Sequence, residues 1–572
     1  MKRLVSFLLA ALLLAVSVFG FSSCGEEEDH GAEISVYLCD EIYDLDPAAS
    51  YTDDNSQLLI SLLFEPLFTL DDNGKLKKAA AKKYEYDKET NTLTITLRES
   101  YWSDGEQVQA KDYVYAWRRV LQMDGASPAA SLLMDIQNAA AFRRGDAGVS
   151  IWDVGVNHVG SDTIRIRFER ADTDRDAFLR NLASVMLSPV KQSNVESSAD
   201  NWTKTAATLS CNGPFRLKQF SVENGYLTLA RNDGYHRPSD STRREEAFVR
   251  PYMIRTLWKS DDSVSDSEHL REMYKRYEDK ALFFIGSLEY TDRAGTKKVR
   301  TVDRLSTYVY AFNTENPLFA DPAVRLVLSS VIDRDKIVSD YVVYAAAATG
   351  LISPTVMDRS RTKSFRKAGG ELISSSASMS VDAARARLAE LGVTGGSFSL
   401  SYNADHPDEY AVALYVTQQW EALGFEVTLR GVGSVVSVEE DSTYNDSGIQ
   451  VAYETGAYDV IGLDFQMMSA NAFPVLCAFD SDYRGNTTGW SNADYNALIE
   501  AAMAEQNAKK KAELLHQAEE KLLSEMPVIP LYFKQTYYLK SASLRKVSFD
   551  YNGFPVFTRT RLSRYKKHLF QN

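Results

Sequence analysis

The distribution of apolar and polar residues predicts strands in the first part of the chain. Residues 92–98 (TLTITLR) and 164–168 (IRIRF) alternate strictly between polar and apolar positions. A period of two is typical of a strand that buries one face. Between these strands a helix is expected from about Ala110, because Tyr113 and Trp117 recur on one face at helical spacing. The first half of the chain therefore predicts strands with occasional helices.

The second half of the chain predicts alternating strands and helices. Asp321 is a favourable N-cap residue, and Pro322 is favourable at the first position of a helix. An alternating segment at 398–402 precedes a helix from about 409 to 423, and a second strand follows at 425–429. Strand, helix and returning strand make a βαβ unit with a right-handed crossover. The predicted fold class is therefore α/β.

An apolar stretch near the N-terminus indicates export. Residues 4–19 follow Lys2 and Arg3, and only Ser6 and Ser17 interrupt their apolar or small character. A helix of this length reaches about 24 Å, which is short of a hydrocarbon core of about 30 Å. A basic start followed by a short apolar run is typical of a secretory signal rather than of a membrane-spanning helix.

The next residues resemble a bacterial lipobox. The segment Phe21-Ser22-Ser23-Cys24 follows that motif, except that Phe21 stands where leucine is usual. The resemblance implies that 1–23 is a signal peptide, that Cys24 is lipidated, and that 24–32 forms a leash. Several acyl chains on one residue suffice for stable anchoring in the lipid bilayer. We therefore expect the protein at the outer face of the bacterial cytoplasmic membrane, with an ordinary signal and a chance cysteine as the alternative.

Composition limits the class of protein. The about 549 residues from Cys24 onward exceed one hydrophobic core and predict two or three domains. The net charge is -14 for the full chain, which argues against a nucleic-acid partner, because nucleic acids are held mainly by cationic side chains. After Cys24 only Cys39, Cys211 and Cys477 remain. These widely separated cysteines predict no disulfide framework.

Signatures of catalysis and of metal binding are missing from the sequence. It contains no GxSxG, GxxxxGK[ST], HExxH or CxxC pattern. No histidine lies within four residues of another histidine or of a cysteine. Residues 480–485 begin like a calcium loop, but Arg484 places a cation where an oxygen ligand is needed. We therefore expect no enzyme, no cofactor and no metal site.

The stretch from Leu97 to Ser131, LRESYWSDGEQVQAKDYVYAWRRVLQMDGASPAAS, carries a family resemblance. It resembles the extracellular solute-binding proteins of the oligopeptide, dipeptide and nickel transporter class, and it is closest to the oligopeptide-binding branch. Further motifs of that family follow its order along the chain: Leu45-Asp46-Pro47, Leu63 to Leu67, Asn212 to Lys218, Arg231 to Tyr235, Tyr308 to Asn313, Asp321 to Leu328, and Pro527 to Tyr532. Each motif also has an ordinary structural explanation, so their joint order carries the resemblance.

The resemblance implies a two-lobed, periplasmic-binding-protein-like α/β fold. It corresponds to type II, in the large peptide-binding cluster, with an additional β-rich domain. By analogy the domains divide as follows: lobe I at 33–70, 203–315 and 532–572; the additional β-rich domain at 71–202; and lobe II at 316–531. Such proteins act, as monomers, by closing two lobes around a solute and presenting it to membrane permease subunits of an ABC importer.

Candidate ligand-binding residues come partly from the fold and partly from the resemblance. In open α/β sheets ligands bind beyond the carboxyl ends of strands. The strand expected to end near Phe465 therefore nominates Asp464, Phe465, Gln466, Met467 and Met468. In the family this segment carries an aspartate that pairs with the amino terminus of the peptide, but here Met468 or Ser469 stands at that place. Asp464 is either a replacement or a structural carboxylate.

Two further groups of candidates follow from the family pattern. Tyr51, Thr52 and Asp53 match an early segment whose backbone pairs with an extended peptide. Tyr308, Tyr310 and Asn313 are expected at one segment that crosses between the lobes, and Tyr532 near the other. Pairing with a peptide backbone would give affinity without side-chain selectivity.

The leading hypothesis is a lipid-anchored receptor that captures peptides and delivers them to an ABC importer. One alternative is an importer receptor for another solute, such as a glycan fragment or a metal chelate. Another is a sensory or adhesive surface protein with the same fold. A surface hydrolase is the third.

Overall fold

The computed structural model describes residues 32–563 with gaps. The residues outside the description are 1–31, 39–41, 43, 50–53, 72–74, 124–128, 172, 199–200, 222–223, 237–247, 250, 258–282, 285–299, 343–344, 359–362, 405, 434–447, 468–470, 482–485, 506, 542–543 and 564–572. The predicted signal peptide, the lipidation site Cys24 and the start of the mature chain lie outside the described residues. Among the helices that are described, none has the length and apolar character needed to cross a membrane.

The strands are distributed over the whole described chain. They are β1 (Ala32–Tyr37), β2 (Phe68–Leu70), β3 (Leu76–Lys78), β4 (Ala81–Asp87), β5 (Thr92–Leu97), β6 (Val156–Val159), β7 (Thr163–Arg167), β8 (Phe215–Ser221), β9 (Tyr226–Arg231), β10 (Phe248–Val249), β11 (Pro251–Leu257), β12 (Phe283–Phe284), β13 (Arg300–Phe312), β14 (Ala346–Ala347), β15 (Gly396–Asn403), β16 (Phe425–Val432), β17 (Val460–Gln466), β18 (Val528–Lys540), β19 (Leu544–Arg545), β20 (Ser548–Phe549), β21 (Pro555–Val556) and β22 (Arg561–Ser563).

The helices concentrate in two regions. The first region holds α2 (Asp54–Leu63), α3 (Ala110–Gln122), η1 (Ala130–Leu133), α4 (Ala139–Arg144), η2 (Ile151–Asp153), α5 (Arg175–Asn181), η3 (Val185–Leu187) and α6 (Gln192–Ser198). The second holds α9 (Pro322–Ser330), α10 (Arg334–Asp340), α11 (Phe365–Gly369), α12 (Val381–Glu390), α13 (Pro407–Ala422), α14 (Ile449–Glu454), α15 (Ala472–Cys477), α16 (Ala493–Ala504) and α17 (Ala508–Glu525).

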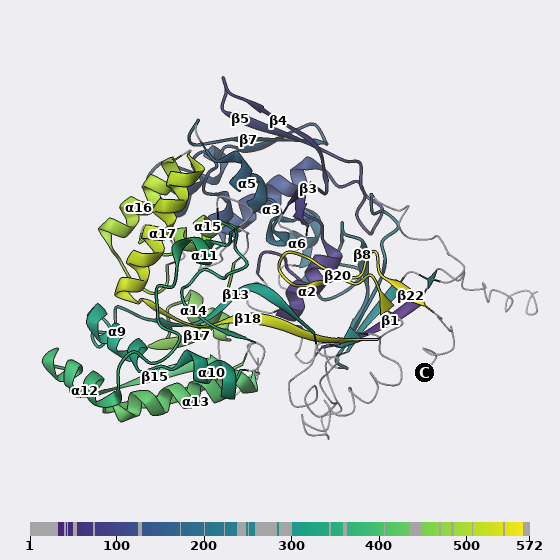
Figure 1. Cartoon of the computed structure of the whole chain (residues 1–572). Helices are drawn as coiled ribbons and strands as arrows, with labels where there is room; N and C mark the ends of the chain where they lie inside the picture. Colours follow the sequence, from purple (N-terminus) through teal and green to yellow (C-terminus); the bar gives the residue numbers. More distant parts are fainter. Residues whose placement is uncertain are drawn as a thin grey trace, which may run out of the picture.

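Two long strands join the halves of the molecule. β13 and β18 pair antiparallel from Arg300↔Tyr538 to Ala311↔Val528 and run across the centre of Figure 1. Along one continuous sheet, β16, β15 and β17 lie beyond β13, whereas β12, β1, β11, β9 and β8 lie beyond β18. Residues 304–312 of β13 are all buried. The two lobes of the α/β fold therefore share a sheet, and β13 and β18 connect them.

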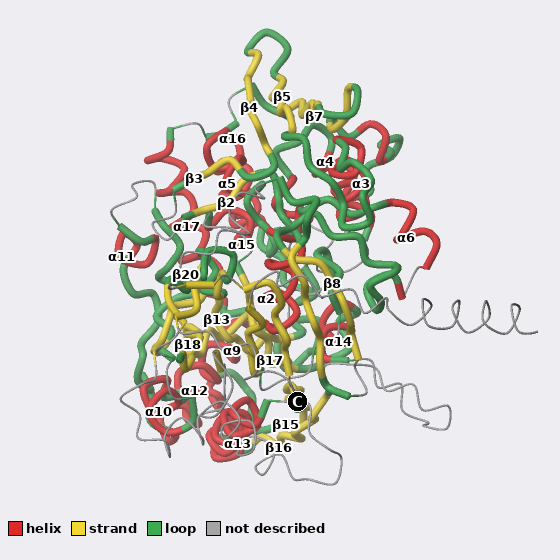
Figure 2. Tube along the Cα trace, turned by 90° about the vertical axis from the view of Figure 1, so that its right-hand side faces the viewer, coloured by secondary structure: helices red, strands yellow, loops and turns green. Residues whose placement is uncertain are grey.

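The predicted βαβ unit is confirmed. β15 and β16 pair in parallel, with Gly396 opposite Phe425, and α13 connects them. β17 also pairs with β15 in parallel, through Leu400↔Val460. The predicted helix start is confirmed as well, because the Asp321 side chain accepts a hydrogen bond from the Ala323 amide at 2.8 Å and Pro322 opens α9. In Figures 1 and 2, α10, α12 and α13 lie at the end of the molecule opposite β4 and β5.

The predicted strands of the first third form one antiparallel sheet. Its order is β4-β5-β7-β6, and β5 pairs with β7 through Thr92↔Arg167 to Thr96↔Thr163. The predicted helix is α3, in which Tyr113 and Trp117 are fully buried. The domain boundaries at 70/71, 202/203, 315/316 and 531/532 stay a prediction.

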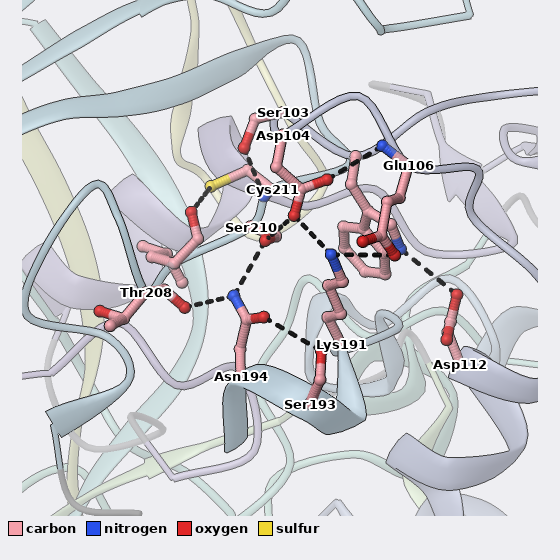
Figure 3. A network of polar contacts seen from close by, with 12 residues as sticks. Ser103, Asp104, Glu106, Asp112, Lys191, Ser193, Asn194, Thr208, Ser210 and Cys211 are labelled. Atoms are coloured by element: carbon pink, nitrogen blue, oxygen red, sulfur yellow. Dashed lines mark hydrogen bonds and ion pairs between the residues drawn. The ribbon is translucent and has the colours of Figure 1, made fainter. Parts of the chain in front are cut away.

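The turn at 102–105, which lies in the family motif between Leu97 and Ser131, holds three segments of the chain together. The Asp104 carboxylate accepts hydrogen bonds from the Lys191 ammonium and the Ser210 hydroxyl, both at 2.6 Å (Figure 3). Lys191 also contacts Glu106 at 3.1 Å, and the Cys211 amide donates to the Ser103 hydroxyl at 3.0 Å. Three segments that are distant in sequence are therefore tied together by charge-assisted hydrogen bonds. This network explains the turn without a ligand.

Candidate ligand-binding site

Some of the predicted binding residues lie outside the described residues. These are Tyr51, Thr52 and Asp53 of the early segment, and Met468 after β17. Their contact with a ligand stays a prediction.

The three predicted tyrosines lie together on the two connecting strands. Tyr308 and Tyr310 of β13 and Tyr532 of β18 are at most 1% exposed. The Tyr308 and Tyr532 rings stack with their centroids 4.9 Å apart. The Tyr308 hydroxyl donates to the carboxylate of Glu409 at 2.9 Å. In this arrangement the rings contact the protein core, so a ligand contact of the tyrosines stays a prediction.

Burial shifts the ionisation of the groups around these rings. It raises the pKa of Tyr308, Tyr310 and Tyr532 far above the usual range, so all three hydroxyls stay protonated. It also raises the pKa of Glu409 to about 7, although nearby His406 and Lys534 and the Tyr308 hydrogen bond oppose the shift. Glu409 is therefore a buried carboxyl that titrates near neutral pH.

Asn313 supports a turn at the end of β13. Its side-chain oxygen accepts from the Glu315 amide at 3.0 Å, and its amide group reaches the Gly456 carbonyl at 3.5 Å. Asn313 is half-buried. Its hydrogen bonds connect the segment after β13 to the loop before β17.

Asp464 forms an internal ion pair. Its carboxylate accepts a hydrogen bond from the Lys534 ammonium at 2.8 Å and another from the Ser306 hydroxyl. The Asp464 side chain is only 7% exposed. β17 and β18 flank β13, so residues far apart in sequence meet on three neighbouring strands. The negative charge of Asp464 is balanced by Lys534 within the protein.

The other predicted residues of this segment pack inward. The Phe465 ring stacks on Phe479 with centroids 5.4 Å apart. Gln466 is 7% exposed, and Met467 is 1% exposed. The Met467 sulfur accepts a hydrogen bond from the Ser353 amide at 3.3 Å. Met467 therefore fills the core in this arrangement, and its role as an adaptable wall stays a prediction.

A cavity of about 820 Å³ lies elsewhere, beside α2, β2, β3 and the β20–β21 hairpin. Its size lies within the range of small-molecule sites. Among its described lining residues none belongs to the predicted site and none comes from 316–531. Sequence reasoning missed this cavity, because its wall comes from several separate segments and no local pattern unites them.

Two family motifs pack against each other at the cavity wall. The Glu65 amide donates to the Asn212 side chain at 3.0 Å, and the Asn212 amide group donates to the Glu65 carbonyl at 2.8 Å. A Cβ on Gly213 would lie 2.6 Å from the Leu63 carbonyl, so only glycine fits there. The Glu65 carboxylate accepts from the Tyr235 hydroxyl at 2.6 Å and also contacts the His236 ring. These motifs shape one wall of the cavity.

The β20–β21 hairpin connects the cavity wall to the second half of the chain. The Tyr551 hydroxyl donates to the Thr355 carbonyl. The Arg304 guanidinium lies 4.0 Å from the centre of the Phe554 ring. Burial raises the pKa of Asp550, in the hairpin turn, to about 6. A movement of Thr355 relative to the first part of the chain would therefore move this wall of the cavity.

Within the described ranges, no group of three or more histidine, cysteine, aspartate or glutamate side chains could hold a metal ion. Cys211 and Cys477 are buried free thiols, and burial raises the pKa of both. Thiols of this kind are poor nucleophiles.

One family model matches most of the chain. Residues 75–486 match the family described as bacterial extracellular solute-binding proteins, family 5, middle region. The chain belongs to this family.

Curated relatives extend over most of the chain. The dipeptide-binding protein DppE of Bacillus subtilis is 25% identical over 524 residues, covering 88% of this chain and 87% of DppE. The probable deoxycholate-binding periplasmic protein YgiS of Escherichia coli is 28% identical over 502 residues, covering 86% of each.

Solved structures share the two-lobed fold. Listeria monocytogenes OppA bound to peptide has a TM-score of 0.75 at 20% identity, covering 93% of this chain and 99% of that structure. The Escherichia coli murein tripeptide binding protein MppA also has a TM-score of 0.75, at 23% identity and with 94% and 100% coverage.

The unliganded open form of MppA differs more. Its TM-score is 0.58, with the same 23% identity and with 94% and 98% coverage. This chain is therefore more similar overall to the peptide-bound OppA structure than to the open form of MppA.

Proposed function

We propose that the protein is a lipid-anchored extracellular receptor that captures peptides by lobe closure and delivers them to an ABC importer. Support comes from the family match and from two relatives of this chain, which are named as a dipeptide-binding and an oligopeptide-binding protein. Binding of this kind needs no catalytic group. It needs a space for the ligand and two lobes that move relative to each other.

One observation carries the proposal. The cavity wall formed by the β20–β21 hairpin is hydrogen-bonded to Thr355, which lies in the predicted lobe II. A movement of the predicted lobe II would therefore act on the hairpin through this hydrogen bond. A ligand that contacts the hairpin would favour the closed arrangement by the difference between its affinities for the two states.

A non-peptide solute is the second candidate. YgiS, a relative of 28% identity, is named for deoxycholate binding. In addition, the Asp464 carboxylate is already paired with Lys534, so it is neutralised before any ligand amine approaches. A ligand without a free amine would lose nothing at this position.

Release of the bound ligand tests the proposal. The protein is purified under native conditions and denatured, and the small molecules that dissociate are identified by mass spectrometry. We expect a ladder of peptides with mixed sequences. One recurrent sugar, bile acid or chelate would replace the peptide part of the proposal, and turnover of peptide or ester substrates by the pure protein would contradict its non-enzymatic part.

Anchoring at Cys24 is tested separately. We expect the full-length protein, expressed in a bacterium, to partition into the detergent phase of a Triton X-114 extract. The Cys24→Ala variant is expected in the aqueous phase, because it has no acyl chains. Equal partitioning of the two proteins would remove the lipid anchor and leave the solute-binding part of the proposal unchanged.

A further inference from the structure

A buried interface joins the two parts of the chain away from the connecting strands. The short helix η1, in the additional domain predicted at 71–202, packs against α15 of the predicted lobe II. All four residues of η1 and all six residues of α15 are buried. On its other sides α15 packs against α16 and α17 of the same lobe. The surface of α15 that faces η1 is therefore covered only while the two parts of the chain stay together.

A carboxyl and an ammonium group from different parts of the chain lie at this η1–α15 interface. Asp135 follows η1 and is 7% exposed. Lys511 of α17 is 5% exposed, and its ammonium lies 5.0 Å from the centre of the Phe473 ring of α15. Lys511 favours the ionised form of Asp135, because opposite charges attract. The interface therefore places an acidic group of the first part against a cation of the second.

Two further titratable groups face Asp135 at the interface. Asp174 is the N-cap of α5, where its side chain accepts a hydrogen bond from the Ala177 amide at 3.0 Å, and its negative charge disfavours ionisation of Asp135. Cys477 of α15 interacts with Asp135 from the opposite side of the interface. Burial raises the pKa of the Cys477 thiol well above its usual range, so this group stays neutral.

The cations of the other helices that pack on η1 have different partners. Arg119 of α3 pairs with the Asp46 carboxylate. Arg175 of α5 lies 4.1 Å from the centre of the Tyr86 ring. Among the described residues, Lys511 and Asp174 are the charged groups that shift the pKa of Asp135. One cation therefore faces two carboxyl groups in a buried place.

Burial outweighs the attraction of Lys511. It raises the pKa of Asp135 from 3.8 to about 6, and Asp174 adds to this shift. Once the interface opens, water reaches the carboxyl group and its pKa returns toward the ordinary value. The closed arrangement therefore holds this proton more tightly than the open one. The resulting stabilisation of the closed arrangement is fully present below the ordinary pKa and is lost as the pH rises through about 6.

We infer that the η1–α15 interface is a pH-sensitive switch, which keeps the lobes closed without a ligand under mildly acidic conditions and loosens when Asp135 ionises. The inference rests on the proposed function only for the capture of a peptide by closure. A peptide is held more tightly when the closed arrangement is more populated, so retention is stronger at mildly acidic pH. A difference of about two pKa units corresponds to an increase of about tenfold in the ratio of open to closed protein between about pH 5 and 7.5.

The thiol of Cys477 reports the opening of the interface. Cys477 is 3% exposed and lies in α15, so a reagent reaches it when η1 moves away. Protein stripped of ligand by unfolding and refolding is treated with dithiodipyridine at several pH values between about 5 and 7.5. The rate of labelling at Cys477 is divided by that of the unfolded protein at the same pH, which corrects for thiol ionisation. We expect this normalised rate to rise about tenfold over the range.

Cys211 is the internal control for unfolding. It is 0% exposed and its amide donates to the Ser103 hydroxyl in the first part of the chain, away from the interface. A reagent reaches Cys211 only when that part of the chain unfolds. We therefore expect Cys211 to be labelled more slowly than Cys477 at every pH.

Matched variants assign the effect to Asp135. Asp135→Asn is expected to give the same slow normalised rate at every pH, because the side chain no longer ionises. Lys511→Met is expected to move the rise to higher pH, because the ammonium that favours ionised Asp135 is gone. Asp176→Asn is the control, because Asp176 is exposed on α5, and it is expected to keep the wild-type rise. Circular dichroism verifies folding, and if one of the first two variants does not fold, the other decides.

The outcomes separate this inference from the proposed function. Equal normalised rates of the wild type at all pH values would overturn the switch, as would a rise that persists unchanged in Asp135→Asn. Labelling of Cys477 no faster than that of Cys211 would also overturn it, because the thiol is then reached only by unfolding. Peptide capture would stand in each of these cases. Conversely, the labelling needs no peptide, so a non-peptide ligand would leave the switch in place.

Discussion

Asp135→Asn is expected to make the stability of the protein less dependent on pH. Asp135 follows η1, which packs against α15, and its side chain is 7% exposed. The Lys511 ammonium of α17 lies near it, itself 5% exposed and 5.0 Å from the centre of the Phe473 ring. Asp135 therefore lies where the first part of the chain meets the helices of the second half.

The magnitude follows from the ionisation of Asp135. Burial raises its pKa from 3.8 to about 6, Lys511 opposes the shift, and the Asp174 carboxylate adds to it. The folded protein therefore holds this proton more tightly than the unfolded chain. The resulting stabilisation is fully present below the unfolded pKa and is lost as the pH rises through about 6. A shift of about two units corresponds to a loss of about 3 kcal/mol at neutral pH.

The assay is urea unfolding at several pH values between about 4 and 7.5. We expect the free energy of unfolding of Asp135→Asn, minus that of the wild type, to rise by about 2 kcal/mol over this range. The substitution also removes the carboxylate partner of Lys511. This changes the difference in the free energy of unfolding by a similar amount at every pH and does not change its slope.

The control is Glu85→Gln, whose side chain is 72% exposed. Its difference curve is expected to stay nearly flat, because an exposed carboxylate stays hydrated after folding. A flat curve for Asp135→Asn as well would refute the assigned burial of this carboxyl.

Three further variants probe the buried charges. Lys534→Met leaves the buried Asp464 carboxylate without its ammonium partner, so the free energy of unfolding is expected to fall by about 3 kcal/mol. Part of this loss is expected to be recovered in Lys534→Met/Asp464→Asn, because the unpaired charge is then removed as well. The Glu519 carboxylate is 0% exposed and lies 2.6 Å from the Arg366 guanidinium. Arg366→Met removes this cation, so the free energy of unfolding is expected to fall by about 3 to 5 kcal/mol. Burial raises the pKa of Glu409 to about 7, so the wild type is expected to lose stability as the pH rises through 7. Glu409→Gln removes this carboxyl, and the variant is expected to show no such loss.

Urea unfolding measures all three variants, and each has its own contradicting result. No recovery in the double variant would show that Lys534 acts by packing rather than by charge. An unchanged stability of Arg366→Met would contradict the bidentate pair with Glu519. Parallel pH profiles of Glu409→Gln and the wild type would contradict the raised pKa of Glu409.

Local patterns predicted the secondary structure well where one face of an element is buried. The polar and apolar alternation of 92–98 appears as β5, and the segments at 398–402 and 425–429 appear as the parallel strands β15 and β16. In these segments burial follows the sequence period directly. The N-cap at Asp321 is likewise a local interaction. Such features need no knowledge of distant residues.

The candidate site was harder to predict, because its contacts join distant residues. Lys534 is seventy positions from Asp464, and only the pairing of β17, β13 and β18 brings the two together. Residues 304–312 of β13 are buried on both faces. The pattern of apolar residues in this strand therefore does not distinguish a residue that faces a ligand, as was expected of Tyr308, from a residue of the core. The cavity depends on the β20–β21 hairpin, whose position no local pattern indicates.

Small-angle X-ray scattering tests lobe closure most directly. The protein is stripped of ligand by unfolding and refolding, and its radius of gyration is then measured before and after adding the peptide that the native protein releases. We expect the radius to be larger without the peptide and to fall when it binds, because closure brings the lobes together. An identical radius and identical scattering profile in both conditions, with binding verified by calorimetry, would contradict capture by closure.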